Sequence, residues 1–124
     1  MLGKLNGMPG NLFTAGFKTG KGSPFEGGTH VPAFWRWKGV LGEGVDINEL
    51  CAHIDLYKTC CELAGVSIPN SVQAIDGRSM LPLLDDDDAD LPDRFLFVQQ
   101  GRWAKGADPN GSKFKNCAVR TERW

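Results

Sequence analysis

The chain has 124 residues, of which 41% are hydrophobic and 23% charged, and its 14 Lys and Arg nearly balance its 15 Asp and Glu. A net charge of −1 and a pI of about 6.1 provide no basic excess of the kind that nonspecific nucleic-acid binding requires. No stretch approaches the roughly 20 consecutive apolar residues that cross a bilayer, and residues 1–4 lack the apolar core of a signal peptide. We therefore expect neither nucleic acid nor a membrane as a partner.

The first third of the chain predicts a loop followed by a strand. Residues 1–28 are rich in Gly, Asn, Thr and Lys, a composition typical of loops. Residues 31–37, with the sequence VPAFWRW, combine aromatic and β-branched side chains that favour a buried strand. Pro32 is compatible with this strand because the first residues of a strand can lack a ladder donor. Residues 45–52 indicate a second, weaker strand.

A helix is predicted over residues 55–64. Its apolar stripe recurs with helical spacing at Leu56, Cys60, Leu63 and Ala64. Asp55 is a suitable N-cap, Gly65 suits the left-handed residue after the last turn, and Pro69 blocks continuation of the helix.

The remainder predicts connecting chain and an antiparallel pair of strands. Residues 70–84 are predicted to form connecting chain without a helix or strand. The acidic run at 85–90 predicts a solvated loop, with calcium binding as the alternative. Residues 94–99 and 116–124 predict two strands joined by a loop rich in Gly, Pro and Asn. Because the first loop is long and no turn signal follows the last strand, we expect a fragment of a larger protein.

The four cysteines and Lys21 are the side chains considered for metal binding, disulfide formation or anion binding. The four cysteines are too few for a small disulfide scaffold and lack the paired C-x2-C spacing of a zinc site. In residues 20–32, glycines permit close approach of a ligand to the backbone, and Lys21 offers a compact cation for an anionic group. A solvated surface lysine is the alternative for Lys21.

Residues 20–32, with the sequence GKGSPFEGGTHVP, resemble a signature of the sulfatase family, as does the WRWKG sequence that follows at 35–39. Three further pieces occur in the family's order, namely HIDL at 53–56, LAGV at 63–66 and DGRSMLPLL at 76–84. The likeness runs from about residue 6 to residue 124. With residues 20–39 counted as one motif, four ordered motifs at family-like spacings support the resemblance.

The resemblance implies an α/β fold, comprising the C-terminal part of a sulfatase-like mixed-sheet domain and the start of a small antiparallel C-terminal sheet. Residues 1–84 would belong to the catalytic domain, and residues 85–124 to a linker and a partial small-sheet subdomain. The implied function is that of an arylsulfatase-like sulfuric ester hydrolase of the alkaline phosphatase superfamily. Its substrate would be a sulfate-ester small molecule or glycan, and its compartment periplasmic, secreted or lysosome-like.

The resemblance also implies roles for three residues. Lys21 corresponds to the catalytic lysine that contacts the sulfate group. His30 is a substrate-binding candidate where the family often has Arg, with a structural role beside the strand as the alternative. Asn6 corresponds to one member of an Asp-Asn pair that completes a divalent cation site, usually calcium, although Leu5 stands where the Asp would be.

The family's nucleophile is a formylglycine made from Cys or Ser in a C-x-[PA]-x-R motif. None of the four cysteines has this context. We therefore expect the isolated chain to be inactive, with the nucleophile and most calcium ligands supplied by a missing N-terminal half. That half is also the expected partner of the chain.

Two other functions stay open from the sequence. The chain could instead be part of a metal-dependent phosphodiesterase or phosphonate hydrolase of the same superfamily, which shares the fold and differs at the nucleophile. It could also be a noncatalytic chain, either truncated or a structural module. An upstream C-x-[PA]-x-R motif would distinguish the sulfatase from the first of these, and gel filtration with and without the N-terminal half would distinguish it from the second.

Overall fold

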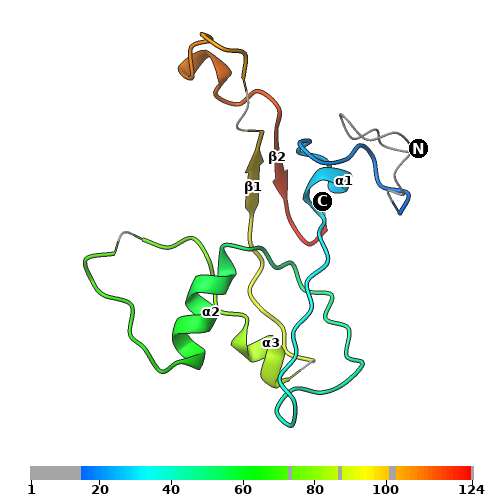
Figure 1. Ribbon diagram of the computed structural model, residues 1–124, viewed down its shortest axis with the longest axis vertical. Helices are drawn as coiled ribbons and strands as arrows, with labels where there is room; N and C mark the ends of the chain where they lie inside the picture. The colour runs from blue at the N-terminus through cyan, green and yellow to red at the C-terminus, as the bar shows by residue number, and fades with distance from the viewer. Residues whose placement is uncertain (1–14, 73, 87, 101–102, 124) are drawn as a thin grey trace. The chain divides into compact units, whose positions relative to one another are not determined.

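The computed structural model describes residues 15–72, 74–86, 88–100 and 103–123 (Figure 1). The chain divides into two compact units. The first unit contains the described residues of 15–34 and 95–123, and the second contains those of 35–94. The boundary predicted near residue 84 separates a catalytic domain from a small-sheet subdomain of a larger protein, and it stays a prediction.

The first unit contains a two-stranded antiparallel sheet. Its strands are β1 (Leu96–Gln99) and β2 (Cys117–Arg120), in a register that places Leu96 opposite Arg120 and Gln99 opposite Cys117. A short helix α1 (Glu26–Thr29) and a 3₁₀ helix η1 (Asn110–Ser112) complete the regular structure described in this unit. The predicted antiparallel pair is confirmed, with shorter strands than the sequence indicates.

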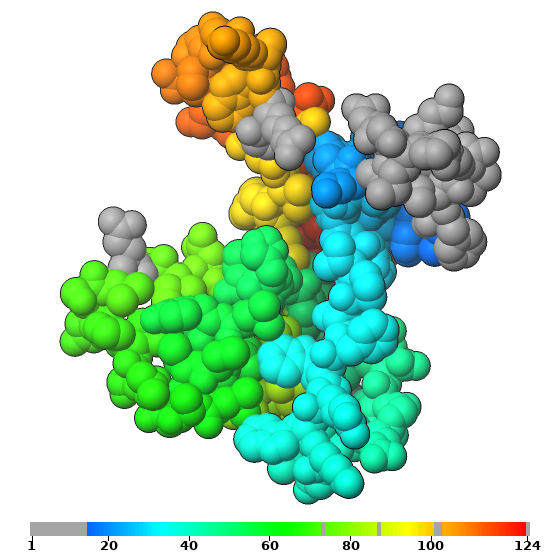
Figure 2. Space-filling model, in the orientation of Figure 1, coloured from blue at the N-terminus to red at the C-terminus, as the bar shows by residue number. Residues whose placement is uncertain are grey.

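The strands predicted at residues 31–37 and 45–52 are not formed. Within the described ranges, the one ladder joins β1 to β2. Residues 31–37 are exposed, as the cyan segment in Figure 2 shows. Phe34 retains 93% of its accessible surface. A strand requires a neighbour for its backbone groups and a surface on which to bury its side chains. The composition of residues 31–37 therefore predicts a buried strand, but no other described segment pairs with these residues or covers their side chains.

The second unit is organised around helix α2 (Asp55–Leu63), which confirms the predicted helix. The helix ends as a Schellman motif, because the Val66 N–H donates to the Cys61 carbonyl at 2.9 Å and the Gly65 N–H donates to the Glu62 carbonyl at 3.0 Å. Gly65 has a φ of 64°, as expected for the residue after the last turn.

The prediction that Asp55 is the N-cap is wrong. Asp55 is the first helical residue, and the capping position falls to Ile54, which has helical backbone angles and makes no side-chain cap hydrogen bond. The carboxylate of Asp55 is occupied by longer-range partners, described below. Those partners, and not a cap, determine its conformation.

A second helix, α3 (Leu81–Asp85), was not predicted, because five residues are too few to establish a period. Met80 and Leu83 are buried and, with Thr59 and Asp55 of α2, form the core of this unit. The Ser79 hydroxyl accepts a hydrogen bond from the Leu81 N–H at 3.2 Å and so satisfies a donor at the start of the helix. Among the described helices, none combines the length and the apolar character needed to span a membrane.

The described residues contain helices and a small antiparallel sheet. This combination is consistent with a piece of an α/β protein. The large mixed sheet implied by the family resemblance stays a prediction.

Candidate functional site

Lys21 lies in a tight turn formed by residues 20–23. The turn is closed by a hydrogen bond from the Ser23 N–H to the Gly20 carbonyl at 3.2 Å. Gly22 has a φ of 87°, a left-handed conformation that glycine adopts without a Cβ penalty. The Lys21 side chain is exposed. The turn therefore presents a cation that a dissolved anion can reach.

Two glycines of α1 allow the helix backbone to pack directly on this turn. A Cβ atom at Gly27 would lie 2.4 Å from the Thr19 carbonyl oxygen, and one at Gly28 would lie 2.2 Å from the Ser23 carbonyl oxygen. The Gly27 N–H also donates to the Lys18 carbonyl at 3.1 Å. The paired glycines of the motif are thus explained by a close approach between two backbones.

Side chains of the same loop reinforce the turn. The Thr19 hydroxyl donates to the Ser23 hydroxyl at 2.8 Å, and the Phe25 N–H donates to the same Ser23 oxygen at 3.1 Å. The Lys18 ammonium lies 4.1 Å from the centre of the Phe25 ring, within the range of a cation–π interaction. Lys18 and Lys21 therefore differ, because an aromatic ring in the loop engages the first ammonium.

His30 follows α1 and has two partners in the same unit. Its ring stacks on Phe17, with centroids 4.9 Å apart and an interplanar angle of 22°. Its Nδ1 atom lies 2.6 Å from Oε1 of Glu26, and its side chain is 52% exposed. His30 is therefore held in place by neighbours and still accessible to a ligand.

Sequence reasoning did not identify the second partner of Glu26. The other carboxylate oxygen of Glu26 pairs with the Arg120 guanidinium on β2. These two residues are 94 positions apart, and no local pattern can indicate a pairing over such a separation. The signals available in the sequence were the opposite charges of the two residues, the place of Glu26 in the glycine-rich motif and that of Arg120 in a predicted strand.

The predicted metal ligand Asn6 lies outside the described residues. Over the ranges that the structure describes, no group of three or more His, Cys, Asp or Glu residues could hold a metal ion. In the acidic run, the Asp86 carboxylate accepts a hydrogen bond from the Asp88 N–H at 3.1 Å, which is a local turn contact. The four cysteines are free thiols.

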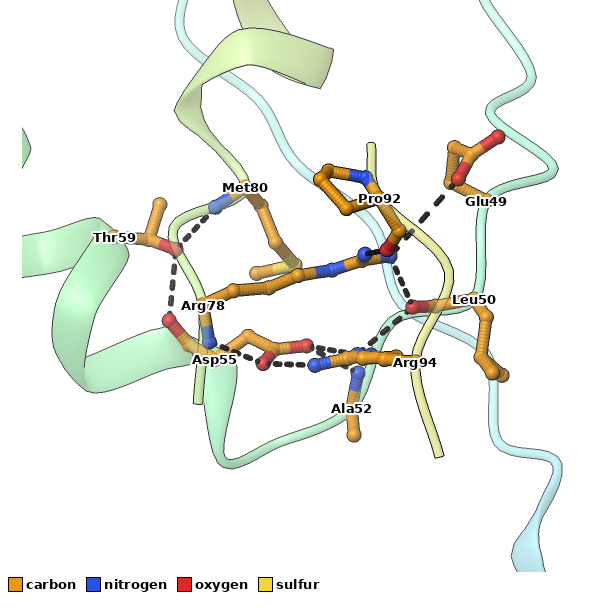
Figure 3. Close-up of polar contacts among 9 residues, drawn as sticks. All are labelled: Glu49, Leu50, Ala52, Asp55, Thr59, Arg78, Met80, Pro92 and Arg94. Atoms are coloured by element: carbon orange, nitrogen blue, oxygen red, sulfur yellow. Dashed lines mark hydrogen bonds and ion pairs between the residues drawn. The ribbon is translucent and has the colours of Figure 1, made fainter. Parts of the chain in front are cut away.

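The second unit contains a buried polar network centred on Asp55 (Figure 3). Its carboxylate accepts hydrogen bonds from the Arg94 guanidinium at 2.7 and 2.5 Å, from the Arg78 N–H at 3.0 Å and from the Ala52 N–H at 2.7 Å. Burial would raise the pKa of Asp55, but the bonds from Arg94 and from the two backbone N–H groups outweigh burial and lower that pKa.

The network extends to α3 and to the segment before it. The Thr59 hydroxyl donates to the Asp55 carbonyl at 2.8 Å and accepts from the Met80 N–H at 2.9 Å. Arg78 and Arg94 each donate to the Leu50 carbonyl, at 3.0 and 2.8 Å (Figure 3). The motifs at residues 53–56 and 76–84 are therefore explained by mutual structural contact.

Sulfatases are among the known proteins that the chain matches. It is 36% identical over 97 residues to steryl-sulfatase of Mus musculus, a match that covers 73% of this chain and 15% of that protein. It is 39% identical over 87 residues to arylsulfatase D of Homo sapiens, covering 69% of the chain and 14% of that protein. With arylsulfatase A of Bos taurus the identity is 42% over 67 residues, or 54% of the chain and 13% of that protein.

The chain thus spans about one seventh of the length of these relatives, since the matches cover 15, 14 and 13% of them. No protein-family model matches the chain, and no solved structure matches it.

Proposed function

Since this chain belongs to the sulfatase family, we propose that it forms part of the sulfate-binding site of a sulfuric ester hydrolase, in which Lys21 contacts the sulfate group. The observation that supports this role is that Lys21 is exposed in a turn against which the backbone of α1 packs. A restrained turn has little backbone freedom left to lose when its lysine binds an anion.

The chemistry of the proposed contact is electrostatic. A sulfate ester carries a negative charge, and further negative charge develops on the leaving oxygen as the S–O bond breaks. At about 4 Å and an effective dielectric constant near 20, two opposite unit charges attract by roughly 4 kcal/mol, which is an upper scale for the contribution of Lys21. An ammonium held against the sulfate group in the bound complex stabilises the charge that develops as the bond breaks.

His30 is the second substrate-binding residue in this proposal. Its support is its 52% exposed ring, held by Phe17 and Glu26 in the same unit as Lys21. One ring nitrogen faces Glu26, so the other is the nitrogen that a substrate oxygen would meet.

The proposal assigns the formylglycine nucleophile and the divalent cation, expected to be calcium, to other parts of an intact sulfatase. Calcium prefers six to eight oxygen ligands, and the described residues gather no acidic group of that kind. Asn6 stays a candidate ligand, and the isolated chain is expected to be inactive because it lacks the reacting group.

Sulfate is preferred over phosphate or phosphonate in the proposal because the relatives named above are sulfatases. A sulfate-ester small molecule or glycan is the proposed substrate class. The periplasmic, secreted or lysosome-like compartment stays a prediction.

The experiment that tests the proposal is Lys21→Ala in an intact sulfatase that contains this chain. We expect kcat/KM for an aryl sulfate to fall at least about a hundredfold, as when one positioned donor to a developing anion is removed. Lys38→Ala is the control, because Lys38 is an exposed lysine in a turn of the other unit, and its effect should stay below about threefold. Lys18 is unsuitable as a control because its ammonium contacts Phe25. Equal effects of the Lys21 and Lys38 substitutions would contradict the proposal.

A further inference from the structure

Glu26, the first residue of α1, contacts two partners, and the proposed function leaves Glu26 itself without a role. Its Oε1 atom lies 2.6 Å from Nδ1 of His30, and its Oε2 atom pairs with Nη1 of Arg120. All three residues belong to the same compact unit. The carboxylate therefore connects the loop that carries Lys21 to strand β2.

The contact with Glu26 determines which ring nitrogen of His30 carries a hydrogen. A carboxylate accepts hydrogen bonds and cannot donate them, so Nδ1 must be the donor in the 2.6 Å contact. A neutral imidazole has a single N–H, and its Nε2 is then an acceptor. A protonated imidazole carries hydrogen on both nitrogens, and its Nε2 is a donor. Only the protonated ring can therefore donate from Nε2 to a sulfate oxygen.

Two further contacts restrain this arrangement. The stack on Phe17, at 4.9 Å between centroids, opposes rotation of the imidazole. Arg120 places a permanent positive charge against the second oxygen of Glu26. The side chains of Arg120 and Glu26 are 37% and 29% exposed, so solvent screens their attraction. We expect this ion pair to affect the orientation of Glu26 more than the stability of the unit.

We propose that Glu26 is a positioning residue for sulfate binding: its carboxylate accepts a hydrogen bond from Nδ1 of His30 whether the ring is neutral or protonated, so that the protonated ring leaves its Nε2–H to the ligand, while Arg120 holds Glu26 in place. The inference rests on the proposed function for the identity of the ligand. The state of the His30 ring, in contrast, can be measured without any substrate.

The first measurement is the tautomer of neutral His30 in this chain, obtained from the ¹⁵N chemical shifts and two-bond couplings of the ring. We expect the Nδ1–H tautomer in the unsubstituted chain, and a shift toward the Nε2–H tautomer, which free histidine side chains favour, in Glu26→Ala. Glu62→Ala, which removes an exposed carboxylate from α2, should leave the tautomer unchanged. An Nε2–H tautomer in the unsubstituted chain, or no shift in Glu26→Ala, would overturn the proposal.

Further variants cover the case in which Glu26→Ala fails to fold, which the loss of β1 and β2 amide signals would reveal. Glu26→Leu keeps a similar side-chain volume but offers no acceptor, so it should remove the preference for Nδ1–H. Arg120→Met should also weaken that preference, whereas Arg120→Lys should preserve most of it by keeping the charge. Identical tautomers in Glu26→Leu and the unsubstituted chain would refute the role of Glu26, and identical behaviour of the two Arg120 variants would refute the role of Arg120.

Kinetics in an intact sulfatase separate this inference from the proposed function. We expect Glu26→Ala to raise KM for an aryl sulfate about tenfold and to change kcat less than about threefold, since it weakens one charged hydrogen bond to the bound sulfate. A loss of activity in Lys21→Ala with no change of KM in Glu26→Ala would refute the positioning role alone. No loss in Lys21→Ala would refute the proposed function, while the tautomer measurement would still decide the role of Glu26.

Discussion

Asp55 and Arg94 form a two-point ion pair, in which Nη1 of Arg94 lies 2.7 Å from Oδ1 of Asp55 and Nη2 lies 2.5 Å from Oδ2. The Asp55 side chain is completely buried and that of Arg94 is 12% exposed. Two backbone N–H groups, of Ala52 and Arg78, donate to the same carboxylate. A buried charge with this set of partners is satisfied, but removing the charge leaves each partner unpaired.

Asp55→Asn should therefore destabilise the second unit strongly. The amide keeps the shape of the side chain but has one acceptor oxygen, and its NH₂ group would face donors. We expect a loss of about 3–5 kcal/mol in the free energy of unfolding, as for a buried pair that loses one partner. Urea unfolding followed by the helical circular dichroism signal measures this loss. Asp76→Asn, at an exposed position of the neighbouring DGR sequence, should change the same quantity by less than about 0.5 kcal/mol.

Acid should remove the stabilisation that Asp55 contributes. Burial would raise the pKa of Asp55, but the bonds from Arg94 and the backbone N–H groups hold it below the ordinary value of about 3.9. The unfolded chain then binds a proton at higher pH than the folded chain does. The contribution is complete above the unfolded pKa and is lost as the pH falls through the lower folded pKa.

We accordingly expect the free energy of unfolding to decline below about pH 4, and to decline less steeply in Asp55→Asn. Urea titrations of both proteins between about pH 2 and pH 7 make the comparison. Parallel pH profiles for the two proteins would show that Asp55 is not the group responsible.

The glycines around the Lys21 turn should differ in their tolerance of a side chain. A Cβ atom at Gly28 would lie 2.2 Å from the Ser23 carbonyl oxygen, whereas one at Gly20 would meet nothing within 4 Å. We expect Gly28→Ala to displace the turn at a cost of about 1–3 kcal/mol, the usual range for overpacking. Hydrogen exchange at the Ser23 amide reports this, because its N–H closes the turn. Gly20→Ala is the matched control, and similar exchange rates in the two variants would refute the close-packing argument.

Helix α2 was predicted correctly because local contacts stabilise it. Helix α2 has an apolar stripe and ends at Gly65, so both its existence and its end can be recognised from neighbouring residues. The strand predicted at 31–37 depends on a distant neighbour, which the described residues do not supply. Composition can indicate that a segment suits a sheet, but it cannot provide the other strand.

The same distinction applies to the candidate site. The glycine-rich motif identified Lys21 and His30, but the pairings of Glu26 with Arg120 and of Asp55 with Arg94 span 94 and 39 positions. Asp55 was predicted as a helix cap because it precedes an apolar stripe, and that local signal is the same whether the carboxylate caps the helix or binds a distant arginine. The choice between those roles depends on tertiary contacts, which a single sequence does not contain.

The exposed apolar face of the β1–β2 sheet should make this chain prone to association. Phe97 is 79% exposed and lies opposite the exposed Val119 in the register, and Phe95, two residues before it, is also exposed. Contiguous apolar surface next to strand edges attracts other chains. We therefore expect the chain to bind a hydrophobic dye and to sediment faster as its concentration rises.

Phe97→Ser should reduce both effects, because it removes the centre of this face. Phe114→Ser is the control, since Phe114 is exposed to a similar extent but lies outside the strands, where a single exposed aromatic residue is ordinary. A chain that stays monomeric and does not bind the dye would contradict the prediction. An equal decrease in dye binding from the two substitutions would show that total aromatic exposure, and not the face of the sheet, controls association.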